Sequence, residues 1–140
     1  MEFNGTFEQR ITDNFAEVIF INFCNNNGWK YKKMGFDNEE HIKNIWNFNK
    51  TLQKLPDFVI EKNEKNYIVE VKGYKRFKKD DFDMIDKLIN AYDSVKAPLI
   101  YAFCWNKKVI FKKPQQVKEL YQEGIEDKYH DGKVFRLLDI

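Results

Sequence analysis

The segment "LPDFVIEKNEKNYIVEVKGYKR", residues 55–76, constrains the fold more than any other part of the chain. Residues 57–61 and 66–72 are two short runs rich in β-branched and aromatic residues, a composition typical of strands. The residues between them, "KNEK", are typical of a tight turn. The segment therefore predicts a β-hairpin around which a sheet is built.

The spacing of apolar residues predicts helices over residues 6–27 and 79–94. The second helix has Asp80 and Asp81 in its first turn, where a negative charge suits the helix dipole. The first helix begins with a capping-box pattern and ends before an Asn-rich stretch and a Gly. It carries an apolar stripe that we expect to face the core: Phe7, Ile11, Phe15, Val18 and Ile19.

The other segments complete an α-β-β-β-α-β-β-α-β order, typical of one α/β domain over residues 1–140 with a mixed sheet. Residues 37–54 show no clean period and are interpreted as a long excursion. The remaining predicted elements are a strand within 28–36, a buried strand over 97–105, a strand over 107–113, a short helix over 114–122 and a strand or docked tail over 133–140.

Bulk composition excludes few functions. With 43% hydrophobic and 33% charged residues, the chain is expected to fold, and its net charge of +2 does not by itself imply a nucleic-acid partner. Cys24 and Cys104 each end an apolar run and are expected to be buried free thiols. We find no signal-peptide pattern and no apolar run long enough to span a bilayer, so a cytoplasmic protein without a membrane partner is expected.

Three ionisable residues converge if the hairpin forms. Asp57 begins its first strand, and Glu70 and Lys72 lie near the end of its second strand on one face, with Val71 pointing to the other. Two neighbouring carboxylates repel unless a cation lies between them, and hard oxygen ligands suit Mg²⁺ or Mn²⁺. The alternative is a solvated hairpin edge, in which an acid–base pair would contribute at most about 1 kcal/mol.

The motif formed by Pro56, Asp57, Glu70, Val71 and Lys72 resembles that of the PD-(D/E)XK, or restriction endonuclease-like, nuclease superfamily. The resemblance implies an αβββαβ core over about residues 6–105, with a mixed central sheet flanked by helices. The C-terminal helix and strand expected within 106–140 lie outside that core. It further implies Mg²⁺- or Mn²⁺-dependent hydrolysis of DNA. Asp57, Glu70 and the Val71 carbonyl would be metal ligands, and Lys72 would position the attacking water. In its small size and in the sequence of its motif, the chain is most similar to phage-type junction-resolving endonucleases and small restriction-type nucleases.

Members of this superfamily often add an acidic residue from the first helix, and Glu17 is the candidate for that catalytic and metal-binding role. Within residues 15–24 only Glu17 and Asn22 are polar. A carboxylate in such apolar surroundings needs a partner, which a metal or Lys72 would supply. The alternative is that Glu17 reaches solvent at the edge of the helix.

The segment "KGYKRFKK", residues 72–79, holds five basic residues in eight, with aromatic residues interleaved. Its place beside the motif predicts contacts with DNA phosphates, although a basic run is often only a solvated face. A homodimer is expected, since cutting two strands needs two active sites. The alternatives to a branched-DNA endonuclease are a nicking or sequence-specific enzyme and, in a different class, a non-catalytic binding module or inhibitor. The candidate nucleic-acid-binding residues are Tyr74, Lys75, Arg76, Lys78, Lys79, Lys32 and Lys33.

Overall fold

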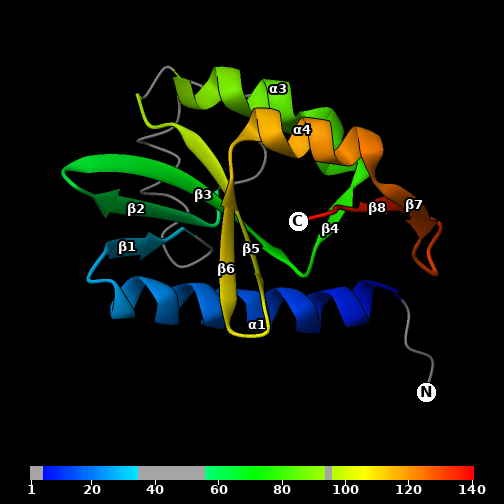
Figure 1. Ribbon diagram of the computed structural model, residues 1–140, viewed down its shortest axis with the longest axis horizontal. Coiled ribbons are helices and arrows are strands. Elements are labelled where there is room, and N and C mark those ends of the chain that lie inside the picture. The colour runs from blue at the N-terminus through cyan, green and yellow to red at the C-terminus, as the bar shows by residue number, and fades with distance from the viewer. Residues whose placement is uncertain (1–4, 35–55, 94–95) are drawn as a thin grey trace.

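The computed structural model describes residues 5–34, 56–93 and 96–140, with the side chains of the first helix from Phe15 onward (Figure 1). The predicted excursion over 37–54 lies outside these residues. Within them, no helix is both long and apolar enough to cross a membrane. The elements are α1 (Gly5–Asn26), β1 (Lys30–Lys33), β2 (Phe58–Lys62), β3 (Lys65–Gly73), β4 (Arg76–Lys78), α3 (Lys79–Asp93), β5 (Leu99–Trp105), β6 (Lys108–Lys112), α4 (Pro114–Glu123), β7 (Ile125–Lys128) and β8 (Val134–Leu137).

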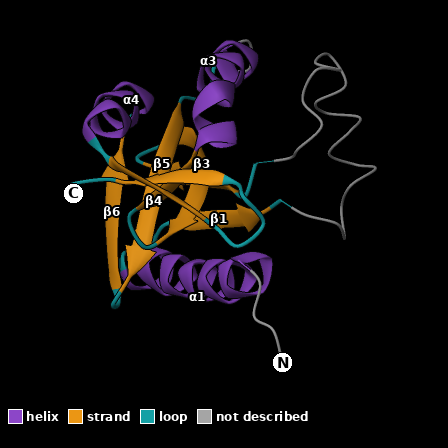
Figure 2. Ribbon diagram, turned by 90° about the vertical axis from the view of Figure 1, so that its right-hand side faces the viewer, coloured by secondary structure: helices purple, strands orange, loops and turns teal. Residues whose placement is uncertain are grey.

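A five-stranded sheet in the order β1-β2-β3-β5-β6 lies at the centre of the fold. β1, β2 and β3 are antiparallel neighbours, and β3 then pairs in parallel with β5, a pairing that requires the crossover made through α3. β6 returns antiparallel to β5. α1 covers one face of the sheet, and α3 and α4 lie on the other (Figure 2). The predicted mixed sheet flanked by helices is therefore confirmed.

A second sheet, in the order β4-β8-β7, was not predicted. β4 follows the turn after β3 and pairs with β8, so the C-terminal strand expected within 133–140 forms and lies beside the basic segment. β7 completes the sheet as an antiparallel neighbour of β8. The strands β4 and β7 have only three and four residues, too few to show a periodic pattern in the sequence.

The central sheet carries a hydrophobic core on each face. Toward α1, the side chains of Phe20 and Cys24 pack with Phe58, Val71 and Cys104. The second core lies toward α3 and α4. Both cysteines are free and buried, as predicted, and burial raises the pKa of the Cys24 thiol to about 11 and that of Cys104 to about 12. These thiols are therefore protonated packing groups at neutral pH.

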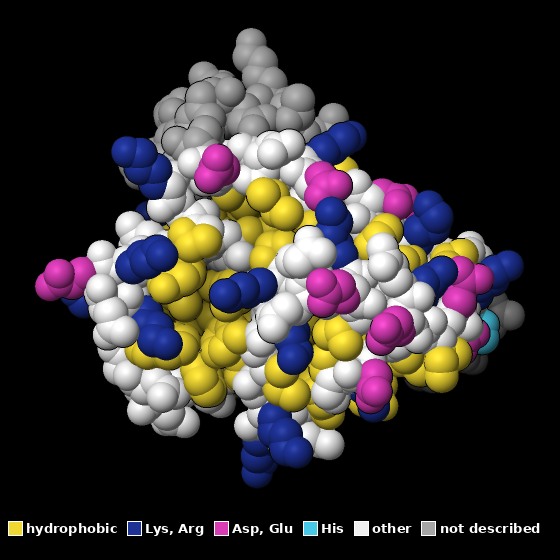
Figure 3. All heavy atoms as spheres, turned by 45° about the horizontal axis from the view of Figure 1, so that its top comes forward, with side chains coloured by type: hydrophobic (Ala, Val, Ile, Leu, Met, Phe, Trp, Pro, Cys, Tyr) yellow, Lys and Arg dark blue, Asp and Glu magenta, His cyan; other side chains and the backbone are white. Residues whose placement is uncertain are grey.

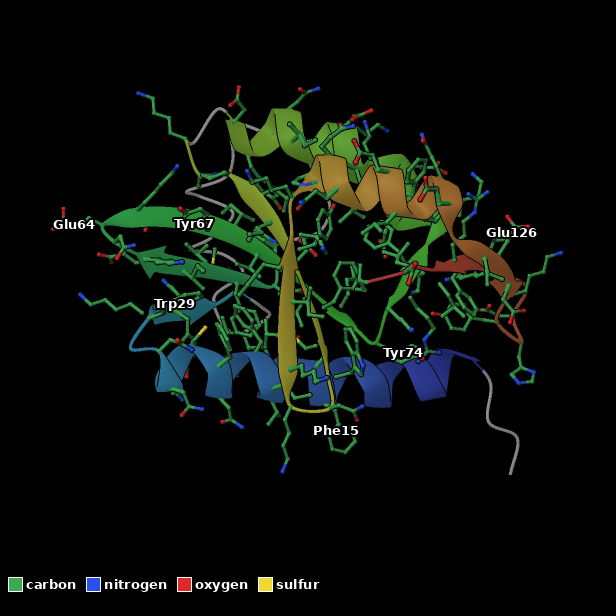
Figure 4. The ribbon with its side chains drawn as sticks, viewed as in Figure 1. Phe15, Trp29, Glu64, Tyr67, Tyr74 and Glu126 are labelled. Atoms are coloured by element: carbon green, nitrogen blue, oxygen red, sulfur yellow. The ribbon has the colours of Figure 1, made fainter. Side chains whose placement is uncertain are left out.

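The predicted core-facing stripe of α1 is wrong for two of its three described residues, Phe15 and Val18. Phe15 is 66% exposed and Val18 is 54% exposed, and Phe15 points away from the sheet (Figure 4). The buried stripe is Ala16, Phe20 and Cys24, whose small first and last members let the helix approach the strands. Of the other predicted stripe residues, Ile19 packs against the core, and the side chains of Phe7 and Ile11 lie outside the described part.

This difference predicts unequal effects of two matched substitutions in α1. Phe20→Ala should lower the free energy of unfolding by about 3–5 kcal/mol, because Phe20 is fully buried. Phe15→Ala should change it by less than about 0.5 kcal/mol, as exposed positions usually do. Urea unfolding measures both values, and equal losses would mean that α1 presents a different face to the sheet.

Candidate active site

The hairpin places the start of β2 beside the end of β3. Phe58 pairs with Val69, so Asp57 and Glu70 lie immediately beyond the last residues of the β2–β3 ladder. The turn residue Glu64 lies at the other end of the hairpin (Figure 4). Side-chain alternation directs Glu70 and Lys72 to the face covered by α3 and α4, while the neighbouring Val71 packs toward α1.

Asp57 is held against the edge of β3 by a backbone hydrogen bond. The N–H of Val71 donates to Oδ2 of Asp57 at 2.7 Å. The N–H and C=O of one strand residue point to the same edge, so the Val71 carbonyl is directed to the side of β3 on which Asp57 lies. The Asp57 carboxyl and the Val71 carbonyl are therefore presented together, as the motif predicts.

The carboxyl groups of Asp57 and Glu70 are close enough to interact strongly. Burial raises the pKa of both groups, and the charge of Asp57 raises the pKa of Glu70 further. Two partly buried carboxyls with raised pKa values fit a site for a divalent cation, which would remove the repulsion between them.

Lys72 lies among three carboxyl groups. Its Nζ is 2.8 Å from Oδ2 of Asp81, and the two side chains are 18% and 28% exposed. Burial lowers the pKa of Lys72, but the charges of Asp81, Glu70 and Asp57 outweigh burial and hold that pKa above its ordinary value. Lys72 is therefore a fixed ammonium group and not a neutral base.

Asp81 is a site residue that the sequence reasoning missed, because its place in the first turn of α3 was explained by the helix dipole alone. In the helix it continues the stripe of Ile85, Leu88 and Tyr92, which face the core beneath α3. Asp80 does not follow this spacing. The signal that would have found Asp81 is therefore its period with the buried residues of its own helix.

Glu17 approaches the site from the opposite face of the sheet. Its Oε2 is 2.9 Å from Nζ of Lys33, and the Glu17 side chain is 26% exposed. Its charge also raises the pKa of Asp57, which places it near the motif. The partner of Glu17 is therefore Lys33, which neither alternative from the sequence named, and the charge of Glu17 also acts on Asp57.

The described residues contain no group of three or more His, Cys, Asp and Glu side chains arranged to hold a metal ion. Two nearby carboxylates are instead ion-paired with lysines, Glu17 with Lys33 and Asp81 with Lys72. The oxygen-bearing groups presented together are the carboxyls of Asp57 and Glu70 and the Val71 carbonyl. Glu17 would need to leave Lys33 to join them.

The turn between β3 and β4 gathers aromatic and basic side chains. Tyr74, labelled in Figure 4, has a φ of 55°, in the left-handed region, and the residue is 37% exposed. Lys75 and Arg76 lie over this ring, with Nζ and Cζ at 5.7 and 5.8 Å from its centroid. Arg76 and Lys78 each lie 6.0 Å from the ring of Tyr129, which precedes β8 and was not predicted to take part.

The other basic candidates are arranged differently. Lys79 forms an ion pair with Asp83 at 2.8 Å, and Lys33 is engaged by Glu17. Lys32 and Lys33 lie on the edge strand β1 of the central sheet, whereas β4 belongs to the small sheet. On the side that carries α3 and α4, acidic and basic side chains are mixed (Figure 3). The basic character that the sequence predicted is therefore concentrated at the β3–β4 turn and β4.

The neighbouring carboxyls of Asp57 and Glu70 predict that the stability of the protein depends on pH. Asp57 and Glu70 have folded-state pKa values above their ordinary values of 3.8 and 4.5. At a pH between the ordinary and the folded-state values, the folded chain therefore binds more protons than the unfolded chain. Their contribution to stability is therefore present at acidic pH and is lost as the pH rises through the folded-state values. Urea unfolding in EDTA should show wild type losing stability with rising pH relative to the Asp57→Asn/Glu70→Gln variant. If the free energies of unfolding of the two proteins changed with pH in parallel, the interaction between Asp57 and Glu70 would be contradicted.

Comparison with known proteins gives no further assignment. No protein-family model matches the chain, and no curated protein or solved structure is significantly similar to it. The resemblance to the PD-(D/E)XK nucleases therefore rests on the motif and on the order of the elements around it.

Proposed function

We propose that the chain is a Mg²⁺- or Mn²⁺-dependent endonuclease that hydrolyses phosphodiester bonds in DNA. The observation that carries the proposal is the convergence of Asp57, Glu70 and Lys72 at the end of β3. Two partly buried carboxyls with raised pKa values gain stability from a divalent cation bound between them. A lysine held among carboxyls beside such a cation suits hydrolysis at phosphorus, where negative charge develops.

Each residue has a distinct role in this proposal. Asp57, Glu70 and the Val71 carbonyl would hold the cation, and Glu17 would add its charge if released by Lys33. When bound, the cation would supply charge stabilisation and a lowered pKa for water. The ammonium group of Lys72 would orient the attacking water and neutralise charge on the phosphate, because its own high pKa keeps it protonated.

The substrate is proposed to be DNA, including branched or otherwise structured DNA. The basic cluster of Lys75, Arg76 and Lys78 begins three residues after Lys72, so it suits phosphates on either side of the scissile one. The half-exposed ring of Tyr74 offers a stacking surface for an unpaired base. Such a base is present in single strands and in branched DNA with unpaired positions, but absent from an intact duplex.

A panel of linear, nicked, branched and single-stranded DNA, with matched RNA, tests the proposal. We expect cleavage of DNA in Mg²⁺ or Mn²⁺ and none in EDTA, with the highest rate on DNA that has unpaired bases. Binding without cleavage in either metal would support the second candidate, a non-catalytic binding module or inhibitor. The observation that favours this second candidate is the engagement of Lys72 by Asp81 and of Glu17 by Lys33. Sedimentation of the protein with and without DNA tests the proposed homodimer.

The basic cluster predicts a change in the salt dependence of DNA binding. Replacing Lys75 and Lys78 with Gln should weaken binding in EDTA and reduce the slope of log K against log salt by about 1.8, close to 0.9 for each phosphate that is no longer neutralised. Lys107→Gln/Lys108→Gln, at the exposed β5–β6 turn, is the matched control and should leave the slope unchanged. An equal reduction in both variants would show that the attraction is diffuse.

A further inference from the structure

Two tyrosine rings and three basic side chains form an alternating row at β4. Tyr74 occupies the turn before β4, and Tyr129 precedes β8, the strand that pairs with β4. The Cζ of Arg76 is 5.8 Å from the centroid of the Tyr74 ring and 6.0 Å from that of Tyr129. Lys75 and Lys78 flank the two rings at 5.7 and 6.0 Å, respectively. The row therefore runs in the order Lys75, Tyr74, Arg76, Tyr129 and Lys78.

Other aromatic residues hold both rings of the row in place. The Tyr74 ring packs edge-on against Trp105, with 5.8 Å between centroids. The Tyr129 ring packs on Phe135 at 4.4 Å, and the backbone N–H of Tyr129 donates to the carbonyl oxygen of Lys133 at 2.9 Å. Tyr74 is exposed and Tyr129 is half-buried. A flat ligand that stacks on these rings would therefore meet surfaces that are already ordered, which lowers the entropic cost of binding.

The row begins beside the motif and then turns away from it. Tyr74 comes two residues after Lys72, whose Nζ lies 5.4 Å over the ring of Phe77. Phe77 is the buried middle residue of β4, and alternation directs its neighbours Arg76 and Lys78 to the opposite face. The row therefore continues on the face of the small sheet that is turned away from Lys72.

The alternation of rings and cations matches the chemistry of an unpaired nucleic-acid strand. Each nucleotide of such a strand offers a flat base, on which an aromatic ring can stack, and a phosphate, which Lys or Arg can contact. A base that stacks on Tyr74 or Tyr129 would displace a flexible side chain, whose charge can then meet the neighbouring phosphate. Distances of 5.7–6.0 Å are near the outer limit for cation–π contacts, so these contacts alone stabilise the fold little.

We propose that this row binds two consecutive unpaired nucleotides of a DNA strand next to the scissile phosphate, with one base on Tyr74 and the next on Tyr129. Arg76, which borders both rings, would bind the phosphate that joins the two nucleotides. The inference deepens the proposed function and rests on it for DNA as the partner and for the place of the scissile phosphate. It adds a substrate class, namely a duplex that carries a single-stranded arm of at least two nucleotides.

Fluorescence anisotropy of labelled DNA in EDTA tests the proposal without cleavage. The ligands are a blunt duplex and the same duplex with one, two or four unpaired nucleotides at one end. Wild type should bind about fivefold or more tightly with the first unpaired nucleotide, and again with the second, as expected for one stacked base at each step. Equal affinity for the blunt and tailed duplexes would overturn the proposal, and this series does not depend on the folding of any variant.

Substitutions of Tyr129 test the second ring. Tyr129→Leu keeps an apolar side chain against Phe135 but removes the flat ring, so it should lose the gain from the second nucleotide and keep the gain from the first. Its affinity for the blunt duplex should stay within about twofold, and its salt dependence should not change because no charge is removed. Tyr129→Phe keeps the ring and should bind as wild type.

Tyr67→Leu is the matched control for the loss of a ring beside a cation. The Nζ of Lys65 lies 5.5 Å over the Tyr67 ring, near the opposite end of β3 from Tyr74 (Figure 4). This variant should bind every duplex as wild type does. If Tyr129→Leu and Tyr67→Leu bind the tailed duplexes equally well, the row does not bind bases.

Cleavage of the same DNA in Mg²⁺ or Mn²⁺ separates this inference from the proposed function. If the tailed duplexes bind as expected but none is cleaved, the proposed nuclease fails and the row stands as a binding surface. If DNA is cleaved but the blunt and tailed duplexes bind equally, the nuclease stands and the row is wrong.

Discussion

Asp57→Asn is expected to abolish DNA cleavage and, at the same time, to make the metal-free protein more stable at mildly alkaline pH. The substitution keeps an oxygen that can accept the hydrogen bond from Val71, and it removes the charge that repels Glu70. Relief of this repulsion should raise the free energy of unfolding by about 1 kcal/mol. Cleavage should fall by at least about a thousandfold, because a metal ligand is removed.

Urea unfolding in EDTA and cleavage in Mg²⁺ measure these two effects in the same protein. Asp86→Asn is the matched control, since Asp86 is an exposed acid on α3 that pairs with Lys118 outside the site. It should leave cleavage unchanged and should not raise stability. A destabilised Asp57→Asn protein would show that Asp57 is a structural residue whose charge the fold needs.

Lys72→Met is the second substitution with a large expected effect. Methionine fills a similar volume but leaves Asp57, Glu70 and Asp81 without the cation that lies among them. The metal-free protein should lose about 1–3 kcal/mol of stability at mildly alkaline pH, because one partner of a largely buried charge pair is removed. Cleavage should fall by about a hundredfold to ten-thousandfold.

The stability of Lys72→Met should also depend on metal more than that of wild type. Mg²⁺ or Mn²⁺ supplies positive charge to the same carboxyls, so either ion should restore part of the missing stability but none of the cleavage. Lys118→Met, which breaks the Lys118–Asp86 pair between α4 and α3, is the control and should show neither response. Full activity in Lys72→Met would remove Lys72 from the mechanism.

The hairpin and its motif were predictable because their determinants are local. Two strand-like runs around "KNEK" set the register of the hairpin. This register alone places Asp57 beside Glu70, without a contribution from other segments. Alternation along β3 then separates Lys72 from Val71. The mixed sheet followed from the helix between β3 and β5, since a parallel pair needs such a crossover.

The parts that were missed depend on packing between distant segments. Asp81 reaches Lys72 only because α3 lies across the end of β3, and Tyr129 reaches Arg76 only because β8 pairs with β4. The face of α1 was misassigned because large exposed residues, Phe15 and Val18, outweigh the small buried ones in a count of apolar side chains. Which face of a helix packs on a sheet depends on how closely the two backbones can approach, and a count of hydrophobic residues does not predict this.

Binding of Mn²⁺ measured by calorimetry tests the central claim most directly, namely that Asp57 and Glu70 hold a divalent cation. Wild type should bind Mn²⁺ at micromolar to millimolar concentrations and gain thermal stability from it. The Asp57→Asn/Glu70→Gln variant should remain folded and bind at least about a hundredfold more weakly, a loss of about 2.7 kcal/mol. Equal affinity in the two proteins, or no binding by wild type with or without DNA, would contradict the account.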